Sequence, residues 1–294
     1  MAERGTIRAA AEAIGYTPSA ISQQLSALES EVGAPVLERR GRNVVLTDAG
    51  RLVLEHGRDA LEALERAEAS VSELHGEPVG RVRIGALPSA TATFLPLALR
   101  ALQTQHPRVR VEVVVHPLDR NVHELRLGGL DVAVDQRYEL APHDLFDGLD
   151  ETVLLEEPLV LLSPASTPIE SVADAESCDW VAAPADTACG RSTRAVLARE
   201  GISPQLRYDV EDMVATVSLV AAGLAVALVP QLTQVHASDS VHVSVVPHEH
   251  RTISAVTRRA GRSRPAVRAV IEHLRIAAQD LAGPAPQSSS PSMT

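Results

Sequence analysis

The N-terminal fold is decided by the stretch Thr6-Ile-Arg-Ala-Ala-Ala-Glu-Ala-Ile-Gly-Tyr-Thr-Pro-Ser-Ala-Ile-Ser-Gln-Gln-Leu-Ser-Ala-Leu-Glu29. Thr6 can cap a helix over residues 7–14, which Gly15 ends. Pro18 suits the first position of a second helix, because its fixed φ angle fits the helix and its missing N–H costs nothing there. Apolar residues recur in that helix at spacings of four, three and four, at Ile21, Leu25, Leu28 and Val32. This spacing predicts one buried face, and the stretch as a whole predicts two short helices joined by a tight turn.

The segment after Gly33 has the pattern of a small β-hairpin. Two short apolar runs, at residues 35–37 and 44–46, are separated by the basic stretch Glu38-Arg-Arg-Gly-Arg-Asn43. Short apolar strands on both sides of a polar stretch are typical of a hairpin. We therefore expect a wing with a basic tip after the two helices.

Residues 47–74 contain no proline and predict one long helix. Thr47 with Asp48 can cap it, and about 28 residues at ~1.5 Å each span about 40 Å. A heptad seam, interrupted by Glu68, is approximated by Leu54, Gly57, Leu61, Leu64 and Val71. Such a seam favours the pairing of two helices, and residues 75–80 are expected to form a hinge.

Strand and helix patterns alternate from residue 81 to residue 282. Expected strands at 82–87, 109–115 and 131–135 alternate with helices near 91–105 and 120–127, which is typical of a parallel sheet. Later strands are expected at 152–155, 159–163, 180–183, 225–229, 242–246 and 253–258, with helices near 191–200, 213–222 and 265–281. These patterns fit two α/β lobes, with lobe I over 81–155 and 264–282 and lobe II over 156–263. The tail 283–294 is rich in Ser and Pro and predicts disorder.

The acidic residues are concentrated outside the N-terminal segment. The chain has a net charge of −11, but residues 1–51 hold six arginines and six acidic residues and are therefore neutral. Phosphate contacts need cations. Nucleic-acid binding by the whole molecule is disfavoured, whereas the N-terminal segment remains a candidate for it.

Other features argue against secreted, membrane, metal-binding and enzymatic classes. The sequence has no apolar leader and no membrane-spanning stretch, so we expect a cytoplasmic protein. Cys178 and Cys189 are expected to be free thiols in that reducing compartment. The histidines lack metal-ligand spacing, so neither a metal site nor a cofactor is expected. Because nucleotide-binding and nucleophile motifs are missing, we do not expect an enzyme.

The N-terminal motif resembles the winged helix-turn-helix of LysR-type transcriptional regulators. The resemblance rests on residues 6–29 and then on Gly33, Leu37, Arg39, Gly41, Arg42 and Leu46-Thr-Asp-Ala-Gly50. It continues to Ile84-Gly85, Gly129-Leu-Asp131 and Val220-Ala-Ala-Gly-Leu-Ala-Val-Ala-Leu-Val-Pro230, and so covers nearly the whole chain. It implies an N-terminal all-α winged helix-turn-helix over 1–46 and a linker helix over 47–74. It also implies a C-terminal α/β two-lobed effector domain of the type 2 periplasmic-binding-protein kind.

The resemblance implies a sequence-specific regulator whose second motif helix enters the major groove of promoter DNA. Linker helices would pair two subunits, dimers would form a tetramer, and RNA polymerase is a further candidate partner. The expected DNA contacts are Thr6, Thr17, Pro18, Ser19, Ser22, Gln23, Gln24, Arg39, Arg40 and Arg42. Their hydroxyl, amide and guanidinium groups can bond phosphates and base edges. Three positions depart from the commonest family pattern, since Pro18 and Ser19 stand where Gln and Pro are frequent and Gln23 stands where Arg is frequent. These departures bear on base preference and not on the fold.

The same resemblance places a small-molecule effector between the two lobes. Ser89 follows the first strand of lobe I and opens a helix, where an anion such as a carboxylate would be favoured. It stands where the family commonly has an effector-contacting hydroxyl, although a helix cap is an equally good interpretation. The expected effector contacts are Ser89, Thr91, Leu118, Ala183, Pro184 and Gly223.

One departure concerns the start of the chain, and two rival classes stay open. The family has a complete helix before the position of Gly5, where this sequence has only residues 1–4. We expect either that the start is misassigned, with roughly ten residues lost, or that the DNA-binding domain is poorly folded, because the loss exposes the faces that carry Ile7, Ile14 and Ile21. Residues 81–282 alone also resemble a solute-binding protein without DNA-binding activity. An enzyme using the same cleft is the second rival, but no nucleophile and base stand at matched spacing.

Overall fold

The computed structural model describes residues 17–40, 43–73, 78–116, 118–143 and 145–282. The chain divides between Ala67 and Glu68 into two compact units. The helix expected over 7–14 and the tail 283–294 lie outside the described residues.

The N-terminal unit contains the second helix of the expected motif, α2 (Pro18–Val32). Thr17 caps this helix, because its Oγ1 accepts a hydrogen bond from the Ala20 amide at 3.2 Å. The helix ends at Gly33, whose φ of 74° lies in the left-handed region that favours glycine. The local signals in the sequence therefore define both ends of the helix.

The hairpin after α2 begins later than the apolar pattern predicted. Its strands are β1 (Leu37–Arg40) and β2 (Asn43–Leu46), paired antiparallel with Leu37 opposite Leu46. The Glu29 carboxylate holds the segment before β1 against α2, since its Oε1 accepts hydrogen bonds from the Val36 amide at 2.8 Å and the Leu37 amide at 3.4 Å. The prediction of a strand over 35–37 was wrong for this reason, and the basic residues 39 and 40 belong to a strand.

Gly50 lies where the hairpin meets the long helix α3 (Asp48–Glu73). A Cβ on this glycine would lie 2.0 Å from the carbonyl oxygen of Val36. Thr47 fixes the same junction, because its Oγ1 donates to the Pro35 carbonyl at 2.6 Å and its amide donates to the Val36 carbonyl at 3.1 Å. The close approach of the two backbones therefore requires glycine at position 50.

Helix α3 corresponds to the helix expected over 47–74. Its 26 residues span about 39 Å at ~1.5 Å per residue. Leu52, Leu64 and Val71 are exposed along it, with Leu64 at 64%. Exposed apolar side chains that gather into one patch, rather than standing singly, are typical of a surface that pairs with another.

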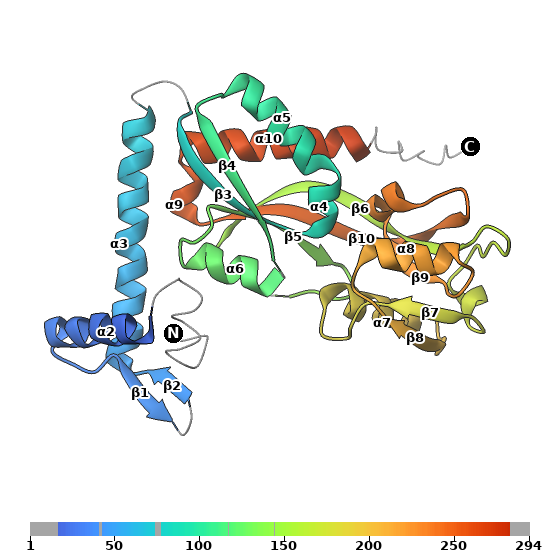
Figure 1. Cartoon of the computed structure of the whole chain (residues 1–294), viewed down its shortest axis with the longest axis horizontal. Helices are drawn as coiled ribbons and strands as arrows, with labels where there is room; N and C mark the ends of the chain where they lie inside the picture. Colours follow the sequence, from blue (N-terminus) through green and yellow to red (C-terminus); the bar gives the residue numbers. More distant parts are fainter. Residues whose placement is uncertain (1–16, 41–42, 74–77, 117, 144, 283–294) are drawn as a thin grey trace, which may run out of the picture. The chain divides into compact units, whose positions relative to one another are not determined.

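The C-terminal unit is built on a six-stranded sheet in the order β4-β3-β5-β10-β6-β9 (Figure 1). Strand β3 (Gly80–Ala86) pairs in parallel with β4 (Val109–Val115) and β5 (Val132–Tyr138), which confirms the predicted parallel arrangement. The remaining strands pair antiparallel and are β6 (Asp150–Pro164), β9 (Ala227–Pro230) and β10 (Val241–Thr257).

Strands β6 and β10 each run through both lobes. The sequence predicted two short strands in each place, because the polar run Glu156-Glu157 and the segment 247–252 interrupt the apolar pattern. The structure corrects this, since the two strands stay paired across the interruption with a bulge between Val245 and His250. The lobe boundary also falls within β10, because Ile253 packs in the core of lobe I although the sequence assigned 156–263 to lobe II.

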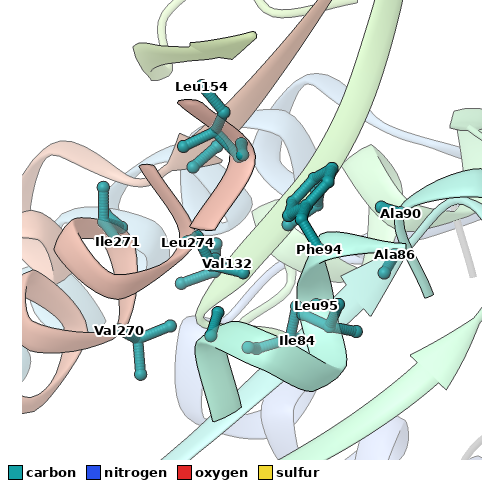
Figure 2. Close-up of a cluster of buried hydrophobic side chains, with 14 of the residues drawn as sticks. Ile84, Ala86, Ala90, Phe94, Leu95, Val132, Leu154, Val270, Ile271 and Leu274 are labelled. Carbon is teal, nitrogen blue, oxygen red and sulfur yellow. The ribbon is translucent and has the colours of Figure 1, made fainter. Parts of the chain in front are cut away.

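The main core of lobe I lies between the sheet and the helices α5 (Phe94–Gln105) and α10 (Pro265–Ala282). Figure 2 shows Phe94 of α5 among side chains from strands and from α10, including Ile84, Val132 and Leu274. The helix expected near 91–105 is interrupted at Thr93, so the five-residue helix α4 (Pro88–Ala92) is separate from α5. Lobe I is completed by α6 (Leu118–Arg126) and α9 (Arg259–Arg262).

Lobe II adds a two-stranded parallel sheet and its own helices. Its elements are β7 (Asp179–Ala182), β8 (Gln205–Asp209), α7 (Ala188–Arg199), α8 (Met213–Ala221) and the 3-10 helices Ala173–Ala175 and Gln231–His236. Trp180 is fully buried, and its Nε1 donates to the Ala175 carbonyl at 3.0 Å. Strand β8 escaped prediction because it is short and alternates exposed with half-buried residues.

Replacing Gly50 with alanine tests the junction of hairpin and linker helix. We expect Gly50→Ala to lower the free energy of unfolding of the N-terminal unit by about 1–3 kcal/mol, because the added methyl group forces the Val36 backbone away. Gly57→Ala is the matched control, since no atom lies within 4 Å of a Cβ there. It should stabilise α3 by up to about 1 kcal/mol. Urea unfolding followed by circular dichroism measures both, and equal effects would contradict the assignment.

Candidate functional site

The expected DNA contacts on α2 all face solvent. They are Thr17, Pro18, Ser19, Ser22, Gln23 and Gln24, and each is exposed. On the other side of the helix Ile21 is 6% exposed, while Leu25 and Leu28 are half-buried. The predicted stripe is therefore buried at Ile21, half-buried at Leu25 and Leu28, and exposed at Val32.

The hydroxyl groups at the start of α2 are engaged locally. Thr17 Oγ1 caps the helix and lies 3.1 Å from Ser19 Oγ. Ser22 Oγ donates to the Pro18 carbonyl at 2.9 Å. In the described part of the chain, the side chains of Gln23 and Gln24 make no hydrogen bond. The two amides are thus the groups of this helix start that are available to a partner.

The hairpin supplies the positive charge of this surface. Arg39 and Arg40 are exposed in β1, and Arg40 Nε lies 3.1 Å from Glu38 Oε1. An ion pair this exposed contributes little to stability, so the Arg40 guanidinium can exchange Glu38 for another anion. The remaining expected contacts, Thr6 and Arg42, lie outside the described residues.

Ser89 differs from Thr91, the other expected effector contact with a hydroxyl group, in its burial and hydrogen bonding. It is 9% exposed in α4, and its Oγ has no hydrogen-bond partner within the described protein. Buried hydroxyl groups are normally paired. Thr91, in contrast, is half-buried and donates its hydroxyl to the Pro88 carbonyl at 2.7 Å. Leu118 is the first residue of α6.

Ala183 and Pro184 follow β7 and lie against the first turn of α7. Their carbonyl oxygens would be 2.5 and 2.0 Å from a Cβ at Gly190, so this approach requires glycine. Arg194 ties the same turn, because its Nη1 donates to the carbonyls of Ala183 and Gly190, both at 2.9 Å. The loop before α7 is therefore fixed by backbone contacts.

Gly223 lies apart from Ala183, another expected effector contact. It follows the C-cap of α8 with a φ of 75°, and three residues later the Val226 amide donates to the Asp179 carbonyl at 2.9 Å. Asp179 starts β7, whereas Ala183 follows its end, so Gly223 and Ala183 lie at opposite ends of this strand. The structure thus separates Gly223 from the loop before α7.

A buried ion pair lies between the cores of the two lobes. Arg251 is 1% exposed and Glu157 is 3% exposed, and they face each other across β10 and β6. Arg251 Nε donates to Glu157 Oε1 at 2.8 Å, and Nη2 contacts the same oxygen. Its Nη1 donates to Gln136 Oε1 at 2.8 Å, and Glu157 Oε2 accepts from the Leu232 amide at 2.5 Å. We call these four residues the joint network.

The joint network continues to the start of α7 through uncharged groups. Tyr138 OH lies 3.4 Å from Gln136 Oε1 and also interacts with the Cys189 thiol. Burial raises the pKa of the Tyr138 hydroxyl well above its usual value. Burial likewise raises the pKa of the Cys189 thiol, although the hydrogen bond with Tyr138 opposes this shift. Both groups are therefore protonated at neutral pH, and both cysteines are free, as the sequence predicted.

No member of the joint network was predicted from the sequence as a functional residue. The available signal was the pair Glu156-Glu157 between two apolar runs, together with Arg251 just before the later apolar strand. Buried charges in proteins are normally paired. The two patterns together could have suggested an ion pair between these strands.

Both parts of the chain match models of known protein families. The family model "Bacterial regulatory helix-turn-helix protein, lysR family" matches residues 1–51, and the model "LysR substrate binding domain" matches residues 75–279. This chain belongs to the LysR family of transcriptional regulators. It is 32% identical over 273 residues to the HTH-type transcriptional regulator ShiR of Corynebacterium glutamicum (strain R), covering 90% of each chain.

Solved structures of LysR-family proteins have the same fold. The crystal structure of CbnR, a LysR family transcriptional regulator, is 25% identical, with a TM-score of 0.56 and coverage of 93% of this chain and 96% of CbnR. Full-length CbnR complexed with its target DNA is also 25% identical, with a TM-score of 0.55 and coverage of 95% and 96%.

The LysR assignment fixes the general function. The chain is a DNA-binding transcriptional regulator with a winged helix-turn-helix and an effector-responsive two-lobed domain. A solute-binding protein without DNA-binding activity is not favoured, because the match includes the DNA-binding motif. None of the described helices combines the length and apolar character that crossing a lipid bilayer requires.

Substitution of Glu157 tests the joint network. Glu157→Gln leaves Arg251 buried without a charged partner, so we expect the free energy of unfolding to fall by about 3–5 kcal/mol. Glu156→Gln, one position earlier and exposed, should change it by less than about 0.5 kcal/mol. Urea unfolding of the full chain compares the two variants. A similar loss in both would show that the ion pair has no special role.

Proposed function

We propose that this LysR-family regulator binds promoter DNA through α2 and the hairpin and responds to a small-molecule carboxylate that contacts Ser89. The supporting observation is the buried Ser89 hydroxyl, whose Oγ has no hydrogen-bond partner within the described protein. A buried hydroxyl without a partner costs free energy that a bound acceptor would restore. A carboxylate is a strong acceptor for such a donor.

The position of Ser89 supports a link between effector binding and lobe arrangement. The Leu87 amide donates to the Val134 carbonyl at 3.2 Å, which fixes the end of β3 beside β5. Ser89 and Gln136 each lie two residues beyond this hydrogen bond, and Gln136 belongs to the joint network. A ligand at Ser89 would therefore be close to the strands that connect the lobes, and its binding would shift the population of lobe arrangements. No cofactor is part of this proposal.

The oligomer that we propose is a dimer paired through α3, with two dimers forming a tetramer. Leu64 and Val71 are both exposed and stand seven residues apart, as one heptad position repeats. Burying these side chains against a second helix would remove apolar surface from water. This burial stabilises the helix pair by about 25 cal/mol per Å² of apolar surface.

The remaining parts of the proposal follow from the role of a DNA-binding regulator. The protein acts in the cytoplasm, where promoter DNA is accessible, and it acts by binding rather than by catalysis. RNA polymerase is the further partner that we propose, because a regulator bound at a promoter lies beside it. The relatives named above are transcriptional regulators, which supports the non-enzymatic assignment.

Thermal-shift measurements with a panel of small organic acids and their neutral amides test the effector site. We expect at least one acid to raise the Tm of the full chain more than its amide does. Ser89→Ala should lower the affinity for that acid about 10- to 100-fold, which is the contribution of a hydrogen bond to a charged group. Ser203→Ala, at an exposed serine, should leave the affinity unchanged. Equal binding of the acid to wild type and Ser89→Ala would exclude Ser89 as a contact.

A charge placed on α3 tests the proposed dimer. Leu64→Glu should reduce the measured mass to that of a smaller assembly, because a carboxylate would be buried in the helix pair. Ala63→Glu adds the same charge one position away, also at an exposed site, and should leave the mass unchanged. Light scattering after size exclusion measures both, and an unchanged mass for Leu64→Glu would rule out α3 as the pairing helix.

A further inference from the structure

One face of α2 consists entirely of small or uncharged polar residues, which we call the outward face. Its members are Ser19, Ser22, Gln23, Ser26 and Ser30, and all five are exposed. At ~100° per residue they lie within an arc of about 100°. Ile21, the buried residue of the helix, points away from this arc.

Gln23 is the only member of the outward face with a long side chain. The serine hydroxyls lie one bond beyond Cβ, and those of Ser19 and Ser22 contact Thr17 Oγ1 and the Pro18 carbonyl. The Gln23 amide lies two atoms further out and carries both donor and acceptor groups. It makes no hydrogen bond in the described part of the chain.

The charges of α2 narrow the kind of base that this face can recognise. The helix contains no Lys or Arg, so the bidentate contact of arginine with guanine cannot come from it. Its only charged residues are Glu29 and Glu31, and Glu29 is occupied by the backbone amides before β1. A glutamine amide pairs bidentately with N6 and N7 of adenine.

We infer that Gln23 is the principal base-reading residue of α2 and that it selects an A·T pair in the major groove. This inference rests on the assignment of α2 as the helix that enters the groove. Gln24 does not share the role, because it lies ~100° further round the helix and outside the outward face. Phosphate contacts, which position the protein but carry no base information, come instead from the hairpin arginines.

The experiment selects binding sites for the full-length protein from a random double-stranded DNA library. Affinities for the selected duplex and its single base-pair variants are then measured at one fixed salt concentration. For the wild type, we expect one A·T pair in each half-site whose replacement by G·C weakens binding about 5- to 100-fold. For Gln23→Ala this penalty should disappear, while the penalties at other positions persist.

Two further variants complete the test. Gln24→Ala is the matched control, since it removes the same exposed amide from the neighbouring position, and it should keep the A·T preference. Gln23→Arg should change the preference at that one position to G·C. The inference is overturned if Gln23→Ala keeps the A·T penalty or if Gln24→Ala abolishes it. Failure of the wild type to select any sequence would instead remove the DNA-binding role on which the inference rests.

Discussion

The ion pair between Arg251 and Glu157 is the interaction on which the two-lobed domain depends. Apolar residues fill the core on each side of it, with Ile253 in one core and Leu159 in the other. Two charges in such a place are costly to desolvate, and only close mutual contact with further hydrogen bonds compensates that cost. Gln136 and the Leu232 amide supply those hydrogen bonds. The arrangement keeps strands β5, β6 and β10 in one register where the lobes meet.

The joint network forms a polar layer between the two apolar cores of the domain. Apolar packing has no strong directional preference, whereas the fixed geometry of a guanidinium and a carboxylate defines one arrangement well. The network reaches Cys189 at the start of α7 through the Tyr138 hydroxyl. Contacts that a bound ligand could change therefore connect the loop before α7 to the strands that carry the joint network.

In the N-terminal unit, polar contacts hold the hairpin in place and leave one face of α2 exposed. Glu29 and Thr47 bond the short segment before β1 from two sides, and Gly50 lets α3 approach it closely. These contacts use the charged and polar groups that do not face outward. The helix face is left neutral, and the arginines of β1 carry the positive charge.

The sequence by itself determined what depends on neighbours along the chain. The start of α2 at Pro18, its end at Gly33, the length of α3 and the parallel order of β3 and β5 all followed from local patterns. The candidate contacts on α2 followed too, because a 3.6-residue period decides which side chains share a face. Only the tertiary structure decided that β6 and β10 are continuous, that β8 is a strand and that Gly223 lies apart from Ala183. It also joined Arg251 to Glu157 over 94 positions, because a pairing between distant residues depends on the packing of every element between them.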